Sequence, residues 1–129
     1  MTLLLDTRAF YWCLRRGVDV PAHVRLALEA APRRYVSDAS AYEVSLKVRL
    51  GKFPGARPLC ERWSDALAAL PAIALPVATP HALAAGAMEW DHKDPFDRLL
   101  AAQAITEGLT LVTADRAFAS APGVDILRW

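Results

Sequence analysis

The sequence predicts an α/β fold in which a mainly parallel sheet lies between two layers of helices, a three-layer α/β/α sandwich. Short apolar runs, the last of them at residues 124–129, alternate with longer segments whose apolar residues recur at helical spacing. Strands that alternate with helices favour parallel pairing, because each helix carries the chain back across the sheet. The 129 residues suffice to bury one core and contain no linker or internal repeat, so we expect a single domain over residues 1–129.

Composition limits the class of protein. Hydrophobic residues make up 54% of the chain and charged residues 22%, which disfavours disorder. No apolar run approaches the length of a membrane span, and residues 3–5 are too few for a signal peptide, so we expect a cytoplasmic protein without a membrane partner. Because the net charge is +1, a nucleic-acid contact would need a local basic patch.

Cysteine, histidine and basic residues form no ligand pattern. Cys13 and Cys60 lack the spacing of metal ligands and are expected to be buried, reduced thiols. His23, His81 and His92 are scattered through the sequence, which disfavours a zinc site. Five basic side chains are expected to be solvated surface charges: Lys47, Lys52, Lys93, Arg98 and Arg116.

The first third of the chain predicts two strands and two helices. Residues 2–5 form a short apolar strand that ends at Asp6, and a helix begins directly after it. A turn over residues 17–20 precedes a second helix, which begins at Pro21. The second strand covers residues 34–37.

A capping pattern marks the third helix. Ser40 and Glu43 have the spacing of a capping box, in which each side chain bonds to the backbone of the other residue. This helix is expected to run to Leu50, with Gly51 as its C-terminal cap. Glu43 would therefore stand at the start of a helix.

The middle of the chain predicts two more helices around a third strand. Pro58 begins a helix whose apolar stripe ends at Leu70, and the strand covers residues 72–77. Pro76 lacks a backbone donor, which indicates a strand end or an edge position. Thr79 is expected to cap the next helix, with three residues facing inward: Leu83, Ala87 and Trp90.

The clearest helix start is the pair Asp94-Pro95. Asp94 is predicted to be the N-cap and Pro95 the first helical residue, which places Asp97 at the third helical position. A buried strand follows at residues 109–113, and Asp115 lies just past its end.

Four acids are predicted to gather at one edge of the sheet. Asp6 and Asp115 follow strands, and the helix starts that carry Glu43 and Asp97 can lean over the same crevice, which is where such sheets bind ligands. Clustered carboxylates repel one another unless a cation neutralises them, and a ligand set made only of oxygen favours Mg²⁺ or Mn²⁺. Such a site suits phosphodiester hydrolysis, so the acids predict a metal-dependent nuclease.

Most of these acids also have a purely structural interpretation. Glu43 would serve as the capping partner of Ser40 and pair with Lys47 one helical turn later. Asp6 is harder to explain in this way, because a carboxylate beside a buried strand needs a compensating partner. Helix capping or interaction with a helix dipole would account for three others: Asp94, Asp97 and Asp115.

Four segments carry a family resemblance that spans the whole chain. They are residues 3–7, residues 40–47 with 50–52, residues 92–104, and residues 111–115 with Phe118. In this order, they resemble the PIN-domain ribonucleases, specifically the VapC-type toxins of bacterial toxin–antitoxin pairs.

The resemblance implies a PIN-like fold and endoribonuclease activity on RNA. It also implies a cognate antitoxin as partner, and assembly both as a homodimer and as a toxin–antitoxin hetero-oligomer. Thr113 would lie beside the metal site, and Asp94 would be an additional acid of this subgroup. The implied site holds Mg²⁺, with Mn²⁺ as a substitute, at Asp6, Glu43, Asp97 and Asp115.

Other functional classes fit the sequence less well. A haloacid-dehalogenase-like phosphatase also places Asp after its first strand, but it needs a second Asp two residues later, where this chain has Arg8. A receiver-type signalling domain needs an acidic pair near the first strand and a phosphorylatable Asp after a central strand, and the sequence shows neither. A PIN-fold module that binds RNA or protein without catalysis remains as an alternative, which the intact acids disfavour.

An aromatic cluster follows the first predicted strand. Phe10, Tyr11 and Trp12 cannot all face the core from one helix, so part of the cluster is expected to form an interface. An amphipathic antitoxin segment would bury the exposed part in a groove.

Overall fold

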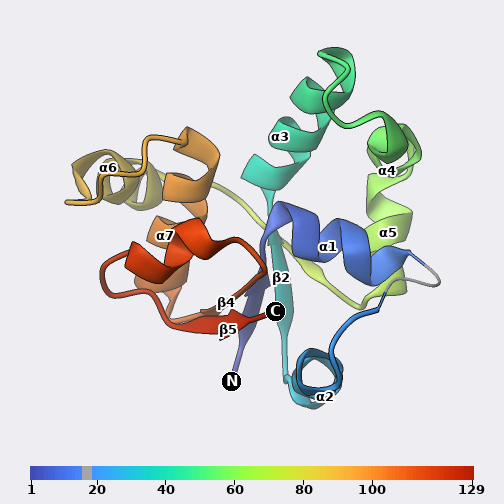
Figure 1. Ribbon diagram of the computed structural model, residues 1–129, viewed down its shortest axis with the longest axis horizontal. Coiled ribbons are helices and arrows are strands. Elements are labelled where there is room, and N and C mark those ends of the chain that lie inside the picture. The colour runs from blue at the N-terminus through green and yellow to red at the C-terminus, as the bar shows by residue number, and fades with distance from the viewer. Residues whose placement is uncertain (16–18) are drawn as a thin grey trace.

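The computed structural model describes residues 1–15 and 19–129 and has a five-stranded parallel sheet at its centre (Figure 1). The strand order is β3-β2-β1-β4-β5, and all four pairings are parallel, which confirms the predicted sheet. The edge position that Pro76 indicated is also confirmed. The turn expected at residues 17–20 begins outside the described residues. The strands are β1 (Leu3–Leu5), β2 (Arg34–Ser37), β3 (Ile73–Leu75), β4 (Thr110–Thr113) and β5 (Ile126–Arg128).

Helices cover both faces of the sheet, which confirms the three-layer sandwich (Figure 1). Leu3 and Leu5 of β1 are buried in one apolar cluster, and Leu4 is buried in the other, because successive strand residues point to opposite faces. The first side carries α1 (Thr7–Leu14), α2 (Ala22–Ala30), α3 (Asp38–Arg49), η1 (Pro54–Ala56), α4 (Arg57–Glu61) and α5 (Trp63–Ala69). The second side carries α6 (Thr79–Ala87), α7 (Pro95–Glu107) and η2 (Arg116–Ser120).

The order of the strands reverses between β1 and β4. From β1 the chain passes to β2 and β3 on one side and then returns to β4 and β5 on the other. Asp6 lies at this point, and its backbone N–H donates to the carbonyl of Val112 in β4 at 3.0 Å. Open α/β sheets bind ligands beyond the carboxyl ends of the strands at such a reversal.

Helix α3 begins earlier than the capping pattern predicts. Its N-cap is Ser37, whose Oγ accepts from the backbone N–H of Ala39 at 3.0 Å, so the capping box of Ser40 and Glu43 is wrong. Ser40 instead lies inside the helix, with its Oγ 2.8 Å from the Thr7 hydroxyl. At the other end, Gly51 has φ +73° and closes the helix as predicted.

Two other helical predictions need correction. The helix expected from Pro58 is divided at Arg62, where φ is −128°, into α4 and α5, so tertiary packing overrides the continuous apolar stripe. In α6, Leu83 and Ala87 face solvent, whereas His81 and Ala85 are buried. His81 turns inward because its ring accepts from Ala78 N–H at 2.9 Å and bonds to Glu107 of α7 at 2.8 Å. Trp90 is buried as predicted, beyond the end of α6.

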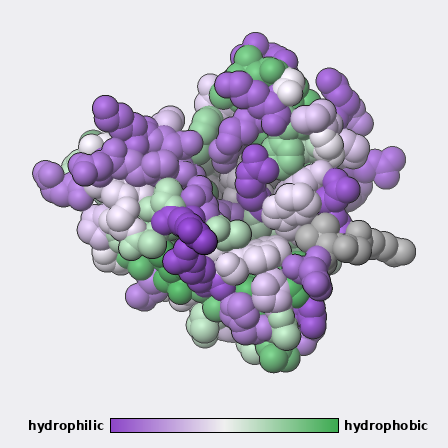
Figure 2. Space-filling model, in the orientation of Figure 1, coloured by the Kyte–Doolittle hydropathy of each residue, from purple (hydrophilic) through white to green (hydrophobic). Residues whose placement is uncertain are grey.

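One face of the molecule is mainly polar. Hydrophilic residues cover most of the face shown in Figure 2, with smaller apolar patches between them. No described helix has the length and apolar character needed to cross a bilayer. Cys13 and Cys60 are free thiols as predicted, but they are half-buried rather than buried. Burial raises the pKa of Cys13 to about 11, which keeps it protonated.

Arg98 is not the solvated charge that the sequence predicts. Its guanidinium donates to one backbone carbonyl at the end of α6, Ala85 at 2.9 Å, and to three in the segment that connects α6 to α7: Met88 at 2.7 Å, Trp90 at 2.7 Å and His92 at 3.0 Å. The fork of guanidinium donors fits this arrangement, which the single ammonium of a lysine cannot reproduce. Arg98 therefore fixes the path of the chain into α7.

Removing this guanidinium should destabilise the fold. We expect Arg98→Ala to lower the free energy of unfolding by about 3 kcal/mol or more, because several carbonyls lose a charged donor at once. Denaturant unfolding measures this loss. Arg49→Ala removes an exposed arginine and should change the value by no more than about 0.5 kcal/mol. Equal stabilities for the two variants would contradict the role of Arg98.

Candidate active site

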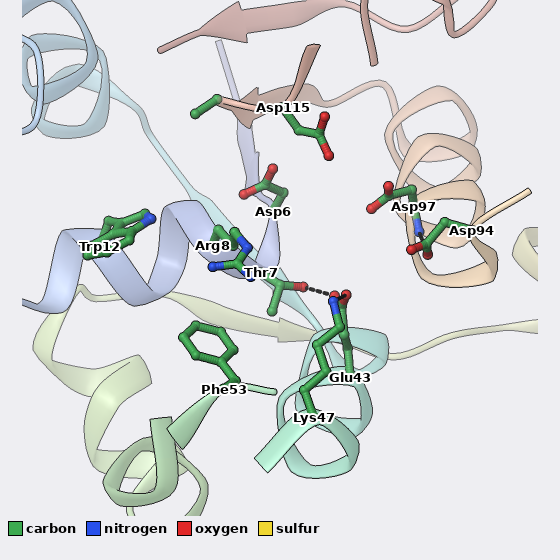
Figure 3. A pocket seen from close by; sticks show the side chains of 11 residues that line it. Asp6, Thr7, Arg8, Trp12, Glu43, Lys47, Phe53, Asp94, Asp97 and Asp115 are labelled. Carbon is green, nitrogen blue, oxygen red and sulfur yellow. Dashed lines mark hydrogen bonds and ion pairs between the residues drawn. The ribbon is translucent and has the colours of Figure 1, made fainter. Parts of the chain in front are cut away.

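A pocket of about 350 Å³ opens beside the carboxyl ends of β1 and β4. Its size is sufficient for a small ligand. The four acids predicted from the sequence line it together with Asp94, and Figure 3 shows them reaching it from different elements. The complete lining is Asp6, Thr7, Arg8, Trp12, Glu43, Lys47, Phe53, Asp94, Asp97, Ala114 and Asp115.

Asp6 lies at the base of the pocket between β1 and α1. It is the N-cap of α1, and its Oδ1 accepts from the backbone N–H of Ala9 at 2.7 Å. The residue is only 5% exposed, and this burial raises the pKa of its carboxyl group to about 6. The hydrogen bonds from Thr113 and Ala9 lower the pKa, while the charges of Asp115 and Glu43 add to the increase.

Thr113 joins Asp6 to Asp115. Its buried hydroxyl hydrogen-bonds to Asp6 and accepts from the backbone N–H of Asp115 at 2.9 Å. The Asp115 carboxylate accepts from Ala117 N–H at 2.9 Å, so it caps η2 and also lines the pocket. The structural and functional interpretations of Asp115 therefore do not exclude each other.

Glu43 comes from the second turn of α3 and is 5% exposed. Its Oε2 lies 2.5 Å from Nζ of Lys47, as the predicted spacing of one helical turn requires. Its Oε1 accepts from the Thr7 hydroxyl at 2.6 Å. The correction at Ser40 thus leaves Glu43 in the pocket, held by α1 and by its own helix.

Asp94 and Asp97 stand at the start of α7. Asp94 is the N-cap as predicted, and its Oδ1 accepts from Phe96 N–H at 2.9 Å and Asp97 N–H at 3.1 Å. Desolvation raises the pKa of Asp97 to about 6, and the charges of Asp94 and Glu43 add to the increase. Asp94 also lines the same pocket, in addition to its capping role.

His92 is a residue of this region that the sequence analysis missed. Its Nε2 lies 2.6 Å from Oδ2 of Asp97, and this hydrogen bond lowers the pKa of Asp97. Within residues 1–15 and 19–129, His92, Asp94 and Asp97 are the group of metal-ligating side chains whose ligand atoms lie within 4.8 Å of one another.

The opposite part of the pocket is aromatic and basic. Phe10 and Tyr11 are buried, and Trp12 is the half-buried member of the aromatic cluster that lines the pocket. The guanidinium of Arg8 lies 4.8 Å from the ring centroid of Phe53, a cation–π contact. Trp12 is therefore the member of the aromatic cluster that is left accessible for the predicted interface.

The donor set fits a divalent cation. Asp6 is buried close enough to Asp115 and Glu43 for both charges to raise its pKa, so the metal-free carboxylates repel one another. Carboxylate oxygens are the preferred ligands of Mg²⁺ and Mn²⁺, and a cation would offset this repulsion.

Comparison with known proteins is informative at the level of family and fold. The sequence pattern of the PIN domain matches residues 3–124. No curated protein matches the chain. The solved VapBC2 of Rickettsia felis bound to a DNA fragment from its promoter has a similar chain, with 17% identity, a TM-score of 0.70, and coverage of 100% of this chain and 99% of that chain.

Two further solved structures are similar at 25% identity. FitAcB from Neisseria gonorrhoeae has a TM-score of 0.68, and the match covers 97% of this chain and 96% of that chain. A toxin–antitoxin complex from Klebsiella pneumoniae has a TM-score of 0.64, with coverage of 95% and 94%. In both comparisons the match covers nearly the full length of this chain and of the solved chain.

The raised pKa values predict how stability depends on pH. In EDTA, the free energy of unfolding should fall as pH rises from about 4 to 7, because folded Asp6 and Asp97 keep protons that the unfolded carboxyl groups, with an ordinary pKa of 3.8, release. For Asp6 the loss amounts to about 3 kcal/mol. Asp6→Asn should therefore reduce this slope and stabilise the metal-free protein at pH 7.

Denaturant unfolding at a series of pH values measures the slope. Asp125→Asn removes an exposed carboxylate outside the pocket and should keep the slope of the wild-type protein. A slope that is unchanged in Asp6→Asn would contradict a buried, destabilising charge at this position.

Proposed function

The chain belongs to the PIN domain family, and we propose that it is a Mg²⁺-dependent endoribonuclease, the toxin of a toxin–antitoxin pair in the cytoplasm. The observation that carries the proposal is the convergence of four carboxylates on one pocket where the strand order reverses. We assign the catalytic site to Asp6, Glu43, Asp97 and Asp115.

These four residues would hold the metal ion, with Mn²⁺ as a substitute for Mg²⁺. When bound, the ion supplies charge stabilisation at the phosphodiester and a more acidic water for in-line attack. Thr113 holds Asp6 and Asp115 in their relative positions through its hydroxyl. Lys47 and Thr7 hold Glu43, so none of these carboxylates depends on the metal alone for its orientation.

The rest of the pocket supports RNA as the substrate. Arg8 supplies a cation next to the acids, which suits phosphate binding, and Trp12 offers a half-buried aromatic ring on the same wall. Unpaired bases stack on aromatic side chains, which favours single-stranded regions of RNA. This local arrangement supplies the basic contact that a net charge of +1 does not.

An antitoxin is the partner that we propose. Solved structures similar to this chain include VapBC2 of Rickettsia felis and a toxin–antitoxin complex from Klebsiella pneumoniae. An antitoxin segment that covers Trp12 and extends a basic side chain among the acids would exclude both metal and substrate. We also propose that the toxin forms homodimers and hetero-oligomers with its antitoxin.

Cleavage of single-stranded RNA tests the proposed activity. We expect internal cleavage with Mg²⁺ or Mn²⁺, none in EDTA, and a loss of about 100-fold or more in Asp6→Asn and Glu43→Gln. Asp125→Asn should cleave at the wild-type rate. Millimolar Mg²⁺ should also raise the melting temperature of the wild-type protein, and less so that of Asp6→Asn, because the ion binds only the folded site.

The outcomes separate an enzyme from a binding module. A wild-type protein that binds RNA but leaves it intact with Mg²⁺ and with Mn²⁺ would support the alternative of a non-catalytic PIN module. Full activity in Asp6→Asn would contradict the assignment of the site.

The contact with the antitoxin is tested at Trp12. Trp12→Ala should weaken binding of the cognate antitoxin by about 2 kcal/mol or more, the effect expected for an aromatic anchor. Isothermal titration with and without Mg²⁺ measures the affinity, which should fall when Mg²⁺ is present. Leu83→Ala truncates an exposed apolar residue of α6 outside the pocket and should bind as the wild-type protein does. Wild-type affinity in Trp12→Ala would place the interface elsewhere.

A further inference from the structure

The segment between α6 and α7 brings an imidazole to the edge of the acidic pocket. His92 is 29% exposed and Asp97 is 15% exposed, and their Nε2 and Oδ2 atoms are 2.6 Å apart. When Asp97 is ionised, its carboxylate can only accept hydrogen bonds, so Nε2 of His92 then donates the proton that joins the two residues.

His92 is held both at its backbone and at its ring. Its backbone carbonyl accepts from Arg98 at 3.0 Å, so the residue is tied to the same guanidinium that organises the whole segment. Its ring packs against Trp90 with centroids 4.9 Å apart. Trp90 is itself held by a hydrogen bond from its indole N–H to Ser120 at 3.1 Å and by packing against Phe118. The imidazole is therefore preorganised.

Asp97 needs such a partner to keep one orientation. It lies in the first turn of α7, where a carboxylate can rotate towards free backbone N–H groups of the helix. Asp94 already accepts from the backbone N–H groups of Phe96 and Asp97. With Oδ2 bound to His92, the Asp97 carboxylate points across the pocket towards Asp6 (Figure 3).

We propose that His92 is a positioning residue, which fixes the carboxylate of Asp97 through its Nε2–H so that the other carboxylate oxygen can bind the divalent cation. The inference rests on the proposed metal-dependent function and adds a residue to it. Partners that orient a metal-binding carboxylate typically contribute 10–100-fold to metal affinity.

A direct role of His92 as a metal ligand is the competing interpretation. His92, Asp94 and Asp97 have ligand atoms within 4.8 Å of one another, but the 2.6 Å contact is a hydrogen bond and Mg²⁺ prefers oxygen ligands. An imidazole ligand would instead favour Zn²⁺ or Co²⁺. The two roles differ in whether an amide can replace the ring.

The experiment compares His92→Gln, His92→Asn and His92→Ala. Glutamine can place an amide donor near the position of Nε2, whereas the asparagine side chain is too short to do so. We expect Mn²⁺ binding, measured by calorimetry without RNA, to weaken about tenfold in His92→Ala and His92→Asn and to return to within about threefold of wild type in His92→Gln. Cleavage should follow the same order at low Mg²⁺ and converge at saturating Mg²⁺.

A second histidine provides the matched control. His81 pairs with Glu107 at 2.8 Å, is buried and does not line the pocket. His81→Ala should lower the melting temperature but leave Mn²⁺ affinity unchanged, which separates positioning from general stability. Thermal unfolding of each His92 variant in EDTA verifies that it is folded.

The remaining outcomes overturn the inference in distinguishable ways. Wild-type Mn²⁺ affinity in folded His92→Ala would show that Asp97 needs no positioning, while the nuclease function would stand. A His92→Gln protein as defective as His92→Ala, with a larger loss for Zn²⁺ than for Mn²⁺, would make His92 a ligand. A wild-type protein that neither binds Mn²⁺ nor cleaves RNA would overturn the proposed function together with this inference.

Discussion

The burial of the Asp6 carboxylate at the reversal of strand order is the constraint on which the site depends. Desolvation raises the pKa of this group to about 6, so its charge at neutral pH opposes folding. The N–H of Ala9 and the hydroxyl of Thr113 offset part of that cost, and both belong to elements that form the fold itself. The helix cap, the end of β4 and the acidic site are therefore one structure, and a change in any of them alters the others.

Asp97, on the other side of the pocket, is held in place by different contacts from those of Asp6. Asp97 comes from α7, on the other side of the sheet from α1, and its orientation depends on His92 rather than on a strand end. Arg98 determines where His92 lies, because its guanidinium binds four carbonyls of the preceding segment. A single half-buried cation thus relates the packing of α6 and α7 to the geometry of the pocket. Glu43 lies close enough to both Asp6 and Asp97 for its charge to raise the pKa of each.

The features predicted correctly from the sequence are those with a local physical cause. Strand β1 is apolar and buried along its whole length, and Asp94 before Pro95 defines a helix start whatever surrounds it. The predictions that were wrong concern positions where two local structures are equally favourable and tertiary contacts determine which one forms. Ser37 and Ser40 are both good caps, and only the position of α1 decides that Ser40 faces Thr7. His92 could not be recognised because its contact with Asp97 depends on the hydrogen bonds of Arg98, which no spacing reveals.

The charge of the pocket connects metal binding with inhibition under the proposed function. Among the described residues that line it, five carry carboxylates and two carry cations, and one of those cations, Lys47, is already paired with Glu43. Without a divalent ion, such a pocket repels a phosphodiester, so the metal must bind before or with the RNA. The same excess of negative charge attracts a basic side chain of a protein partner. An antitoxin that inserts a basic side chain would neutralise the carboxylates as the metal does. Antitoxin and metal would therefore compete for the same carboxylates, which catalysis requires.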